Sequence, residues 1–209
     1  MDLDLSPEHV LLRTTVRAFM ENEVAGIIDE HEREHRFPTE IVHRLGAMGW
    51  LGIPVPEEDG GAGMGNLAYA IAVEEISRVW GSLGIIVAAH TSLGCGPLMI
   101  AGTADQKERF LRPMAAGEVI GAYGLTEPGA GSDATRIQTK ATRREGGGWV
   151  INGRKHFITG GAEAEFALVF AVTDSAKRAQ GGITAFLVDA DSPGYSVTRV
   201  QRTMSPYQN

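Results

Sequence analysis

The hydrophobic residues in the first half of the chain recur with the period of an α-helix. Five segments with this period are predicted to be helical: Pro7 to Ile28, Pro38 to Met48, Leu67 to Val79, the apolar stretch after Gly84, and Thr103 through Met114. Ser6 before Pro7 predicts an N-cap followed by proline at the first helical position. Thr103 and Gln106 form a capping-box pattern, in which each side chain bonds the other residue's backbone N–H. The pattern therefore predicts an all-α domain over residues 1–118.

After Gly117 the period changes to two, as in half-buried β-strands, and residues 137–143 alternate in this way. Asn152 and Gly153 are predicted to form a two-residue hairpin turn, because both tolerate positive φ. The predicted strands are residues 149–151, 154–159, 166–173, 183–188 and 195–200. Helices followed by strands, without βαβ alternation, predict an α+β fold. Its second part is expected to be an antiparallel β-barrel or sandwich over residues 119–209, truncated at the C-terminal end.

The amino-acid composition limits which binding partners and which location are expected for the protein. With 19 basic and 26 acidic residues the net charge is −7, so nucleic acid is not an expected partner, whereas a small anion still fits a local pocket. Cys95 is the only cysteine, so no internal disulfide is expected. The acidic N-terminus lacks the features of a signal peptide, and glycine, proline and polar residues interrupt the apolar segment 83–101. We expect a soluble, cytoplasmic protein without a membrane span.

Residues 31–35 match H-E-x-x-H, a zinc-protease pattern that places two histidines on one helix face with a glutamate between them. The match lies within a continuous charged run from Asp29 to Arg36, and no convincing third ligand follows it. A catalytic zinc needs a third protein ligand and a dry cavity. We therefore expect a solvated helix end and no metal site.

Two glycine-rich segments have the look of nucleotide-binding loops. Residues 129–134 match G-x-G-x-x-A, but that fingerprint works only where a strand leads into a helix, and the chain from Thr135 onward alternates like a strand. The same glycines could let the backbone approach a phosphate, and the alternative is a plain turn between strands. Residues 60–65 lack the Gly-Lys-Ser/Thr ending of a P-loop and are predicted to be a flexible connection.

Residues 123–133, with the sequence YGLTEPGAGSD, resemble the signature segment of the acyl-CoA dehydrogenases. Three further segments resemble the same family in the same order along the chain: residues 45–61, 102–118 and 149–159. The resemblance covers essentially the whole chain, which makes it more specific than a single motif.

The resemblance implies FAD as the cofactor and two segments that contact its tricyclic ring. The implied contacts are Tyr123, Leu125, Thr126, Phe157, Ile158 and Thr159. Hydrogen-bond donors near the ring nitrogens and carbonyls stabilise the charge that the ring gains on reduction. Gly129 and Gly131 resemble the turn that approaches the pyrophosphate, and Ser132 would contact both FAD and the CoA moiety of the substrate. Many members have tryptophan where this chain has Phe157, which keeps an apolar wall without a hydrogen-bond donor.

The implied reaction is the α,β-dehydrogenation of an acyl-CoA thioester to trans-2-enoyl-CoA in fatty acid β-oxidation, with hydride transfer to flavin N5. A glutamate removes the α proton, and the resemblance places this base in a C-terminal domain beyond Asn209. No catalytic residue is assigned in this chain, and Glu127 is expected to be structural. The implied electron acceptor is electron-transfer flavoprotein, and the implied full-length form is a homotetramer. Two alternatives remain: a non-catalytic split or degenerate subunit that binds FAD or acyl-CoA, and a flavin oxidase of the same superfamily.

Overall fold

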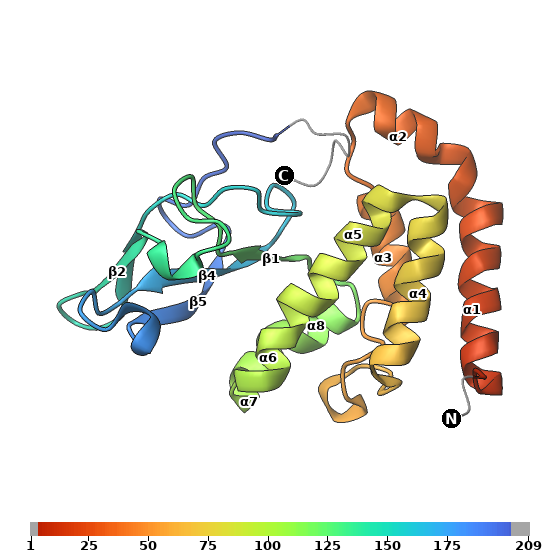
Figure 1. Ribbon diagram of the computed structural model, residues 1–209, viewed down its shortest axis with the longest axis horizontal. Coiled ribbons are helices and arrows are strands. Elements are labelled where there is room, and N and C mark those ends of the chain that lie inside the picture. Colours follow the sequence, from red (N-terminus) through yellow and green to blue (C-terminus); the bar gives the residue numbers. More distant parts are fainter. Residues whose placement is uncertain (1–3, 202–209) are drawn as a thin grey trace.

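A layer of helices lies beside a smaller β-sheet domain in the computed structural model, which describes residues 4–201 (Figure 1). The longer helices are α1 (Pro7–Phe19), α2 (Ile28–Glu34), α3 (Thr39–Ala47), α4 (Gly65–Val79), α5 (Gly81–Ala89) and α6 (Gly96–Ala101). The shorter ones are α7 (Ala104–Gln106) and α8 (Arg112–Ala115), with π-helical segments η1 (Met20–Val24), η4 (His90–Cys95) and η5 (Lys107–Leu111), and 3₁₀ turns η2 (Ala25–Ile27), η3 (Glu57–Asp59), η6 (Ala134–Arg136) and η7 (Arg178–Gln180). The strands are β1 (Gly121–Gly124), β2 (Lys140–Arg143), β3 (Trp149–Asn152), β4 (Phe166–Val172) and β5 (Ile183–Asp189).

The local signals for the helix starts are confirmed. The Ser6 hydroxyl accepts a hydrogen bond from the His9 backbone N–H at 3.3 Å, and the capping box of Thr103 and Gln106 is present in both directions. Ile41 and Leu45 are buried on α3, as its apolar pattern requires. Met48, in contrast, is 38% exposed, because the helix ends at Ala47 and the chain turns at Gly49, whose φ is 78°.

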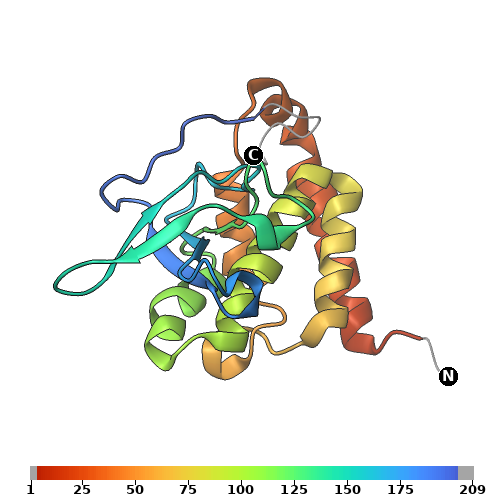
Figure 2. The same cartoon turned by 60° about the vertical axis from the view of Figure 1, so that its left-hand side comes forward.

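The apolar segment after Gly84 belongs to one continuous helix, Gly81–Ala101, formed by α5, η4 and α6. Within the described residues it is the one helix long and apolar enough to cross a membrane by length and composition. Half of its most apolar window is buried against the rest of the protein, as in a core helix. It packs against α4 and the start of the sheet domain, which places it between the two halves (Figures 1 and 2).

The predicted α+β class is confirmed, and the sheet is open and mixed. Strand β4 pairs antiparallel with β5 along its length, and β2 pairs antiparallel with β3. Strand β1 runs parallel to β4, with Gly121 opposite Phe166, and β2 meets the end of β4 in parallel at Lys140 and Val172. Because β1 is joined to β4 by a long connection and not by a hairpin, this pairing departs from the all-antiparallel arrangement expected. The predicted division at residues 118 and 119 falls in the connection between α8 and β1.

The hairpin turn lies at residues 144–148, before the predicted turn at Asn152 and Gly153. Strands β2 and β3 are joined through residues 144–148, where Arg144 N–H donates to the Gly148 carbonyl at 3.1 Å and three successive glycines have positive φ. Gly153 instead lies against Thr139, the residue before β2, since a Cβ there would come within 2.2 Å of the Thr139 hydroxyl oxygen. The predictions of strands at 154–159 and 195–200 are wrong, because both segments lack ladder pairing. Residues 202–209, the end of the predicted β domain, lie outside the described part of the chain.

The glycine-rich segment 60–65 is a hydrogen-bonded loop, which differs from the flexible connection expected. Three consecutive backbone N–H groups, at residues 62–64, donate to carbonyls within residues 52–55 at 2.9–3.0 Å. A Cβ at Gly61 would lie 2.2 Å from the Val55 carbonyl oxygen, so glycine permits this close packing.

Residues 31–35 have a structural role, and the expectation that this segment is a solvated helix end is wrong for His31. This ring is 1% exposed, with Nε2 at 3.0 Å from the Glu40 carboxylate and Nδ1 at 3.1 Å from the Arg36 carbonyl. Glu32 accepts hydrogen bonds from Trp80 Nε1 at 2.7 Å and from the Ser82 hydroxyl at 2.8 Å, so it fixes the start of α5. Among residues 4–201, no group of three or more His, Cys, Asp or Glu side chains is arranged to hold a metal ion.

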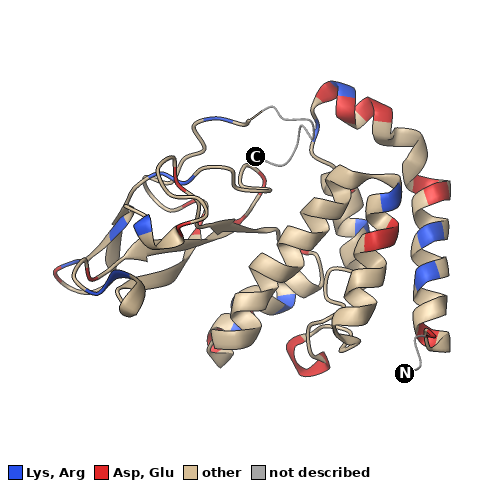
Figure 3. Cartoon of the chain, in the orientation of Figure 1, with Lys and Arg blue, Asp and Glu red and all other residues tan. Residues whose placement is uncertain are grey.

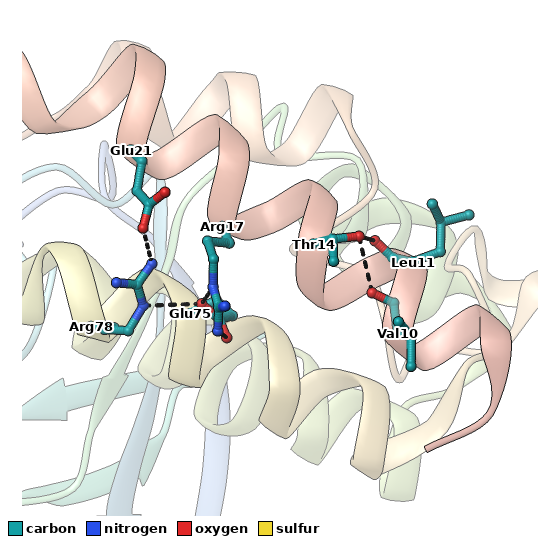
Figure 4. Close-up of polar contacts among 7 residues, drawn as sticks. All are labelled: Val10, Leu11, Thr14, Arg17, Glu21, Glu75 and Arg78. Carbon is teal, nitrogen blue, oxygen red and sulfur yellow. Dashed lines mark hydrogen bonds and ion pairs between the residues drawn. The ribbon is translucent and has the colours of Figure 1, made fainter. Parts of the chain in front are cut away.

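Helices α1 and α4 are joined by a charged cluster around Glu75 (Figure 4). The Glu75 side chain is 3% exposed, and it accepts hydrogen bonds from Arg17 Nε at 2.9 Å, Arg17 Nη2 at 2.6 Å and Arg78 Nε at 3.1 Å. Arg78 also pairs with Glu21 of η1. Hydrogen bonds from Arg17 and then Arg78 hold the pKa of Glu75 below its ordinary value, although burial opposes this.

Replacing Glu75 with glutamine is expected to lower the free energy of unfolding by about 1–2 kcal/mol, because both arginines lose charged hydrogen bonds but stay half exposed. Since the folded-state pKa of Glu75 is lowered, its contribution is present above the unfolded-state pKa and is lost as the pH falls through the folded-state pKa. Urea unfolding at several pH values measures both effects. Glu74→Gln removes the same charge from an exposed neighbouring position and should change little; equal losses in the two variants would contradict the role of the cluster.

Candidate functional site

A cleft of about 180 Å³ lies between the long helix and the first strand of the sheet domain. We call it the ring cleft. Its lining residues are Ala89, Leu93, Gly121, Tyr123, Leu125, Thr126, Phe157 and Thr159. The structure thus brings together side chains from β1, the segment after it and the segment after β3, as the sequence predicted. Ile158 packs instead against the helical core, and the exposed Gly131 and Ser132 do not line the cleft.

Three hydrogen bonds hold the two predicted segments together. The Lys155 ammonium donates to the Leu125 carbonyl at 3.0 Å and to the Glu127 carboxylate at 2.8 Å. The His156 backbone N–H donates to the Thr126 carbonyl at 2.9 Å. Lys155 and Leu125 are 30 positions apart in the sequence, so these bonds fix the relative position of two distant segments and of their side chains in the cleft.

Glu127 is the centre of this connection. Its carboxylate is 7% exposed and also accepts hydrogen bonds from the backbone N–H groups of Gln138 at 2.6 Å and Thr139 at 2.9 Å. Burial opposes its ionisation, but the hydrogen bonds from Lys155 and the backbone outweigh burial and lower the pKa of Glu127 to about 2. A carboxylate with this pKa and three hydrogen bonds already made accepts no proton near neutral pH, which fits the structural role expected for it.

Phe157 has an unusual backbone conformation at the cleft. Its φ is 57°, in the left-handed region that costs a non-glycine residue about 1 kcal/mol, and its side chain is 53% exposed. The His156 ring stacks on the Phe157 ring, with centroids 3.9 Å apart and planes at 27°, and the far nitrogen of His156 contacts the Gln201 amide. An exposed aromatic ring held in a strained conformation indicates a surface prepared for a ligand.

The cleft also offers unused hydrogen-bonding groups. The hydroxyls of Thr126 and Thr159 are half-buried, and neither has a hydrogen-bond partner within residues 4–201. Tyr123 packs on Phe170 with ring centroids 5.0 Å apart, and burial raises the pKa of its phenol, which therefore stays neutral. An apolar wall with a few free hydroxyl groups suits a flat heteroaromatic ligand with a polar edge.

Neither backbone conformation nor close packing within the described residues requires the glycines of the turn at residues 129–133. Neither Gly129 nor Gly131 has positive φ, and a Cβ at either position would meet nothing within 4 Å. After this turn Asp133 caps the short η6, accepting from the Thr135 backbone N–H at 3.2 Å. No α-helix follows within the described residues, so the dinucleotide fingerprint lacks its required context. The buried alternate positions from Ile137 onward confirm the predicted pattern, although the strand itself begins at Lys140.

The helix side of the ring cleft was not predicted. Ala89 and Leu93 line it from α5 and η4, and Leu93 is 40% exposed. Their apolar periodicity indicates only a core helix, so the sequence gives no signal that this part faces a cleft. The π-helical geometry of η4 is a feature that often occurs at functional sites, but it is visible only in the structure.

Comparison with known proteins agrees with this arrangement. The sequence model of the acyl-CoA dehydrogenase N-terminal domain matches residues 6–118, and that of the middle domain matches residues 122–208. Among curated relatives, the short-chain specific acyl-CoA dehydrogenase of Clostridium acetobutylicum is 47% identical over 98% of this chain and 53% of its own length. The mitochondrial short-chain specific enzyme of Mus musculus is 45% identical over 93% of this chain and 47% of its own length. The chain therefore spans about half the length of the curated relatives it matches.

Solved structures have the same fold. Butyryl-CoA dehydrogenase from Megasphaera elsdenii has a TM-score of 0.92 at 34% identity, with 100% of this chain and 55% of that chain covered. A glutaryl-CoA dehydrogenase from Mycobacterium smegmatis in complex with FADH2 has a TM-score of 0.89 at 31% identity, with 98% of this chain and 51% of that chain covered. A solved structure described as the electron transferring flavoprotein of Acidaminococcus fermentans has a TM-score of 0.89 at 39% identity, with 93% of this chain and 50% of that chain covered.

The fold and the cleft define an α+β protein in which a helical domain and an open mixed sheet together line the ring cleft. With family matches over both parts, the chain belongs to the acyl-CoA dehydrogenase family.

Proposed function

We propose that the protein is an FAD-dependent acyl-CoA dehydrogenase and that this chain supplies one wall of its flavin site. The observation that carries the proposal is the ring cleft, where an exposed aromatic ring and two unpaired hydroxyls meet from two segments tied together by Lys155 and Glu127. In this reaction, bound FAD supplies the acceptor for the hydride from the β carbon of the acyl group.

The residues of the cleft fit such a group. Tyr123, Leu125 and Phe157 would cover the apolar part of the ring, and the hydroxyls of Thr126 and Thr159 would donate to its polar edge. Gly129 and Gly131 would let the backbone approach the pyrophosphate, which explains glycines that nothing within the described chain requires.

Fewer residues of this chain are assigned to the substrate than to the cofactor. Ser132 is exposed on the same turn, and we assign it contacts with both the cofactor and the CoA moiety. Glu127 is excluded as the base because Lys155 and two backbone N–H groups engage its carboxylate. We therefore assign the base to another part of the complete protein. The proposal includes electron-transfer flavoprotein as the acceptor, a homotetrameric assembly and a cytoplasmic location.

Replacing Thr126 with alanine is expected to lower the FAD content of the purified complete protein or to slow flavin reduction by roughly tenfold, because one charge-stabilising donor is lost. Absorbance at the flavin band and stopped-flow reduction measure the two effects. Thr142→Ala, an exposed threonine on β2 outside the cleft, is the matched control. Unchanged FAD content and reduction rate in Thr126→Ala would remove Thr126 from the site.

Anaerobic mixing with acyl-CoA thioesters separates dehydrogenase from oxidase and from a non-catalytic subunit. A dehydrogenase should bleach its flavin with substrate and reoxidise slowly when air is admitted. Rapid reoxidation would identify an oxidase, and a flavin that no acyl-CoA bleaches would support a binding subunit.

A further inference from the structure

The peptide group that joins Leu125 to Thr126 lies at the ring cleft, because both residues belong to its lining. The carbonyl oxygen of this group accepts a hydrogen bond from the Lys155 ammonium at 3.0 Å. No peptide bond within the described residues is cis, so the Thr126 N–H points away from this carbonyl and from Lys155. That N–H has no hydrogen-bond partner within residues 4–201. One end of the peptide group is therefore engaged by a charged donor, and the other end is free to bind a ligand.

Two further contacts fix the position of Lys155 against this backbone. The His156 backbone N–H donates to the Thr126 carbonyl at 2.9 Å, so consecutive residues hold both carbonyls that flank the Thr126 side chain. The alkyl stem of Lys155 packs on the end of β1, because a Cβ at Gly124 would lie 3.4 Å from the Lys155 Cγ. The place of the ammonium relative to the cleft is therefore set by the fold.

Lys155 brings a formal charge to a cleft whose lining has none. No residue of the lining is Lys, Arg, Asp or Glu, and the long helix Gly81–Ala101 on the other side of the cleft carries none either, as its tan colour in Figure 3 shows. The Lys155 side chain is 12% exposed, and its Nζ lies 2.8 Å from the buried carboxylate of Glu127. This ion pair is neutral as a whole, but its positive end is the one that contacts the Leu125 carbonyl. The pair is therefore a fixed dipole whose positive end lies at the cleft.

We propose that Lys155 is a positioning residue that raises the reduction potential of the bound cofactor by acting through the Leu125–Thr126 peptide group. The inference rests on the proposed function, which places a flavin in the ring cleft. In that reaction the C–H bonds at the α and β carbons break and a C=C bond forms. The α proton goes to the base, and the β hydride carries two electrons and one proton to the cofactor, so the site gains one unit of negative charge.

The charge of Lys155 favours this gain in two ways. A charged donor on the carbonyl polarises the peptide group, which strengthens the Thr126 N–H as a donor to the new negative charge. The positive end of a buried ion pair also attracts that charge directly, because the interaction is weakly screened away from water. Both effects stabilise the reduced cofactor more than the oxidised one.

Redox titration of the complete FAD-loaded protein against a reference dye measures the midpoint potential of its flavin. Lys155→Met should lower the preference for the reduced over the oxidised cofactor about tenfold, which lowers the two-electron midpoint potential by about 30 mV. Glu127→Gln should raise the potential by about 30 mV, because Lys155 keeps its charge and loses the carboxylate that balances it. Lys155→Arg keeps a charged donor and should retain the original potential. Lys177→Met and Asp174→Asn are the matched controls, since they remove the same charges from an exposed ion pair outside the cleft and should leave the potential unchanged.

The opposite signs of the two shifts separate this role from a merely structural one. If Lys155 only holds the two segments together, both variants weaken FAD retention, and the potential of the retained flavin stays unchanged or moves in the same direction in both; either result overturns the proposal. Should Lys155→Met hold no FAD, Glu127→Gln decides alone, and an unchanged or lowered potential there overturns the proposal. A flavin whose potential responds to neither charge contradicts only this inference, whereas a complete protein that binds no FAD overturns it together with the proposed function.

Discussion

Replacing Glu127 with alanine is expected to lower the free energy of unfolding by about 3–5 kcal/mol, the largest effect of any single substitution that we propose. The change leaves the Lys155 ammonium, 12% exposed, without its carboxylate partner. It also removes the acceptor of the Gln138 and Thr139 backbone N–H groups. A buried charge and two unpaired donors are each costly. Urea denaturation followed by circular dichroism measures the loss.

The pH dependence of stability gives a second measure of Glu127. Because its folded-state pKa is about 2 and its ordinary value is 4.5, the unfolded chain binds the proton first as the pH falls. The stability supplied by this carboxylate is therefore complete above about pH 5 and is lost progressively toward about pH 2. Glu127→Ala should lack this component of the acid profile.

Two further variants distinguish the loss of the buried Glu127–Lys155 ion pair from the loss of a negative charge anywhere in the domain. Glu163→Ala removes an exposed carboxylate from the same domain and should change stability by less than about 0.5 kcal/mol. Glu127→Gln/Lys155→Met removes both charges and should be less destabilised than Glu127→Ala alone, because no charge is left unpaired. A double variant as unstable as the sum of its single changes would show that the two residues act independently.

Signals confined to a few neighbouring residues allowed the helix starts to be predicted. Ser6 and Thr103 cap their helices with bonds to residues three positions away, so the sequence contains all the information needed. The hairpin illustrates the limit of such signals. Asn152 and Gly153 have a strong turn preference, but the glycines at 146–148 supply the turn, and Gly153 is needed for its contact with Thr139.

Features that depend on distant residues could not be predicted from patterns. The parallel pairing of β1 with β4 joins residues 45 positions apart, Gly121 and Phe166, and no local period indicates it. His31 is buried within a charged run because Glu40 and the Arg36 carbonyl satisfy both ring nitrogens. Glu75 likewise occupies the buried face of α4 only because two arginines from different turns and helices reach it.

The site residues that lie in two continuous segments of the sequence were predicted, whereas the contacts that position those segments were not. The residues at 123–126 and 157–159 were assigned through a resemblance to a family, and the structure places five of them around one cleft. The hairpin signal at Asn152 and Gly153 suggested that residues 154–159 form a strand, whereas they form a loop whose Phe157 takes a left-handed conformation. The geometry of the cleft thus depends on bonds made by Lys155 and His156, which no spacing rule identifies.

The contact between helix α3 and the segment that leads into the sheet domain is a further long-range requirement. A Cβ at Gly46 would lie 2.4 Å from the Gly117 Cα and 2.6 Å from the Ala116 carbonyl oxygen. Both are backbone atoms, so no side-chain rotation can relieve the clash. His43, on the same helix, has Nδ1 at 2.5 Å from the Gly117 carbonyl oxygen, which ties the helix to this segment. Gly117 itself has a φ of 71°, a conformation that favours glycine.

Replacing Gly46 with alanine is therefore expected to lower the free energy of unfolding by about 2–3 kcal/mol, because α3 must separate from residues 116–117. The usual gain of up to about 1 kcal/mol from alanine in a helix does not offset this clash. Thermal and urea unfolding measure the change. Gly81→Ala provides the matched control: it makes the same substitution at the first residue of α5, where a Cβ meets nothing within 4 Å, and should leave stability unchanged or raised. A Gly46→Ala protein as stable as Gly81→Ala would show that the segment before β1 shifts freely, and the fixed position of β1 at the ring cleft would then need another cause.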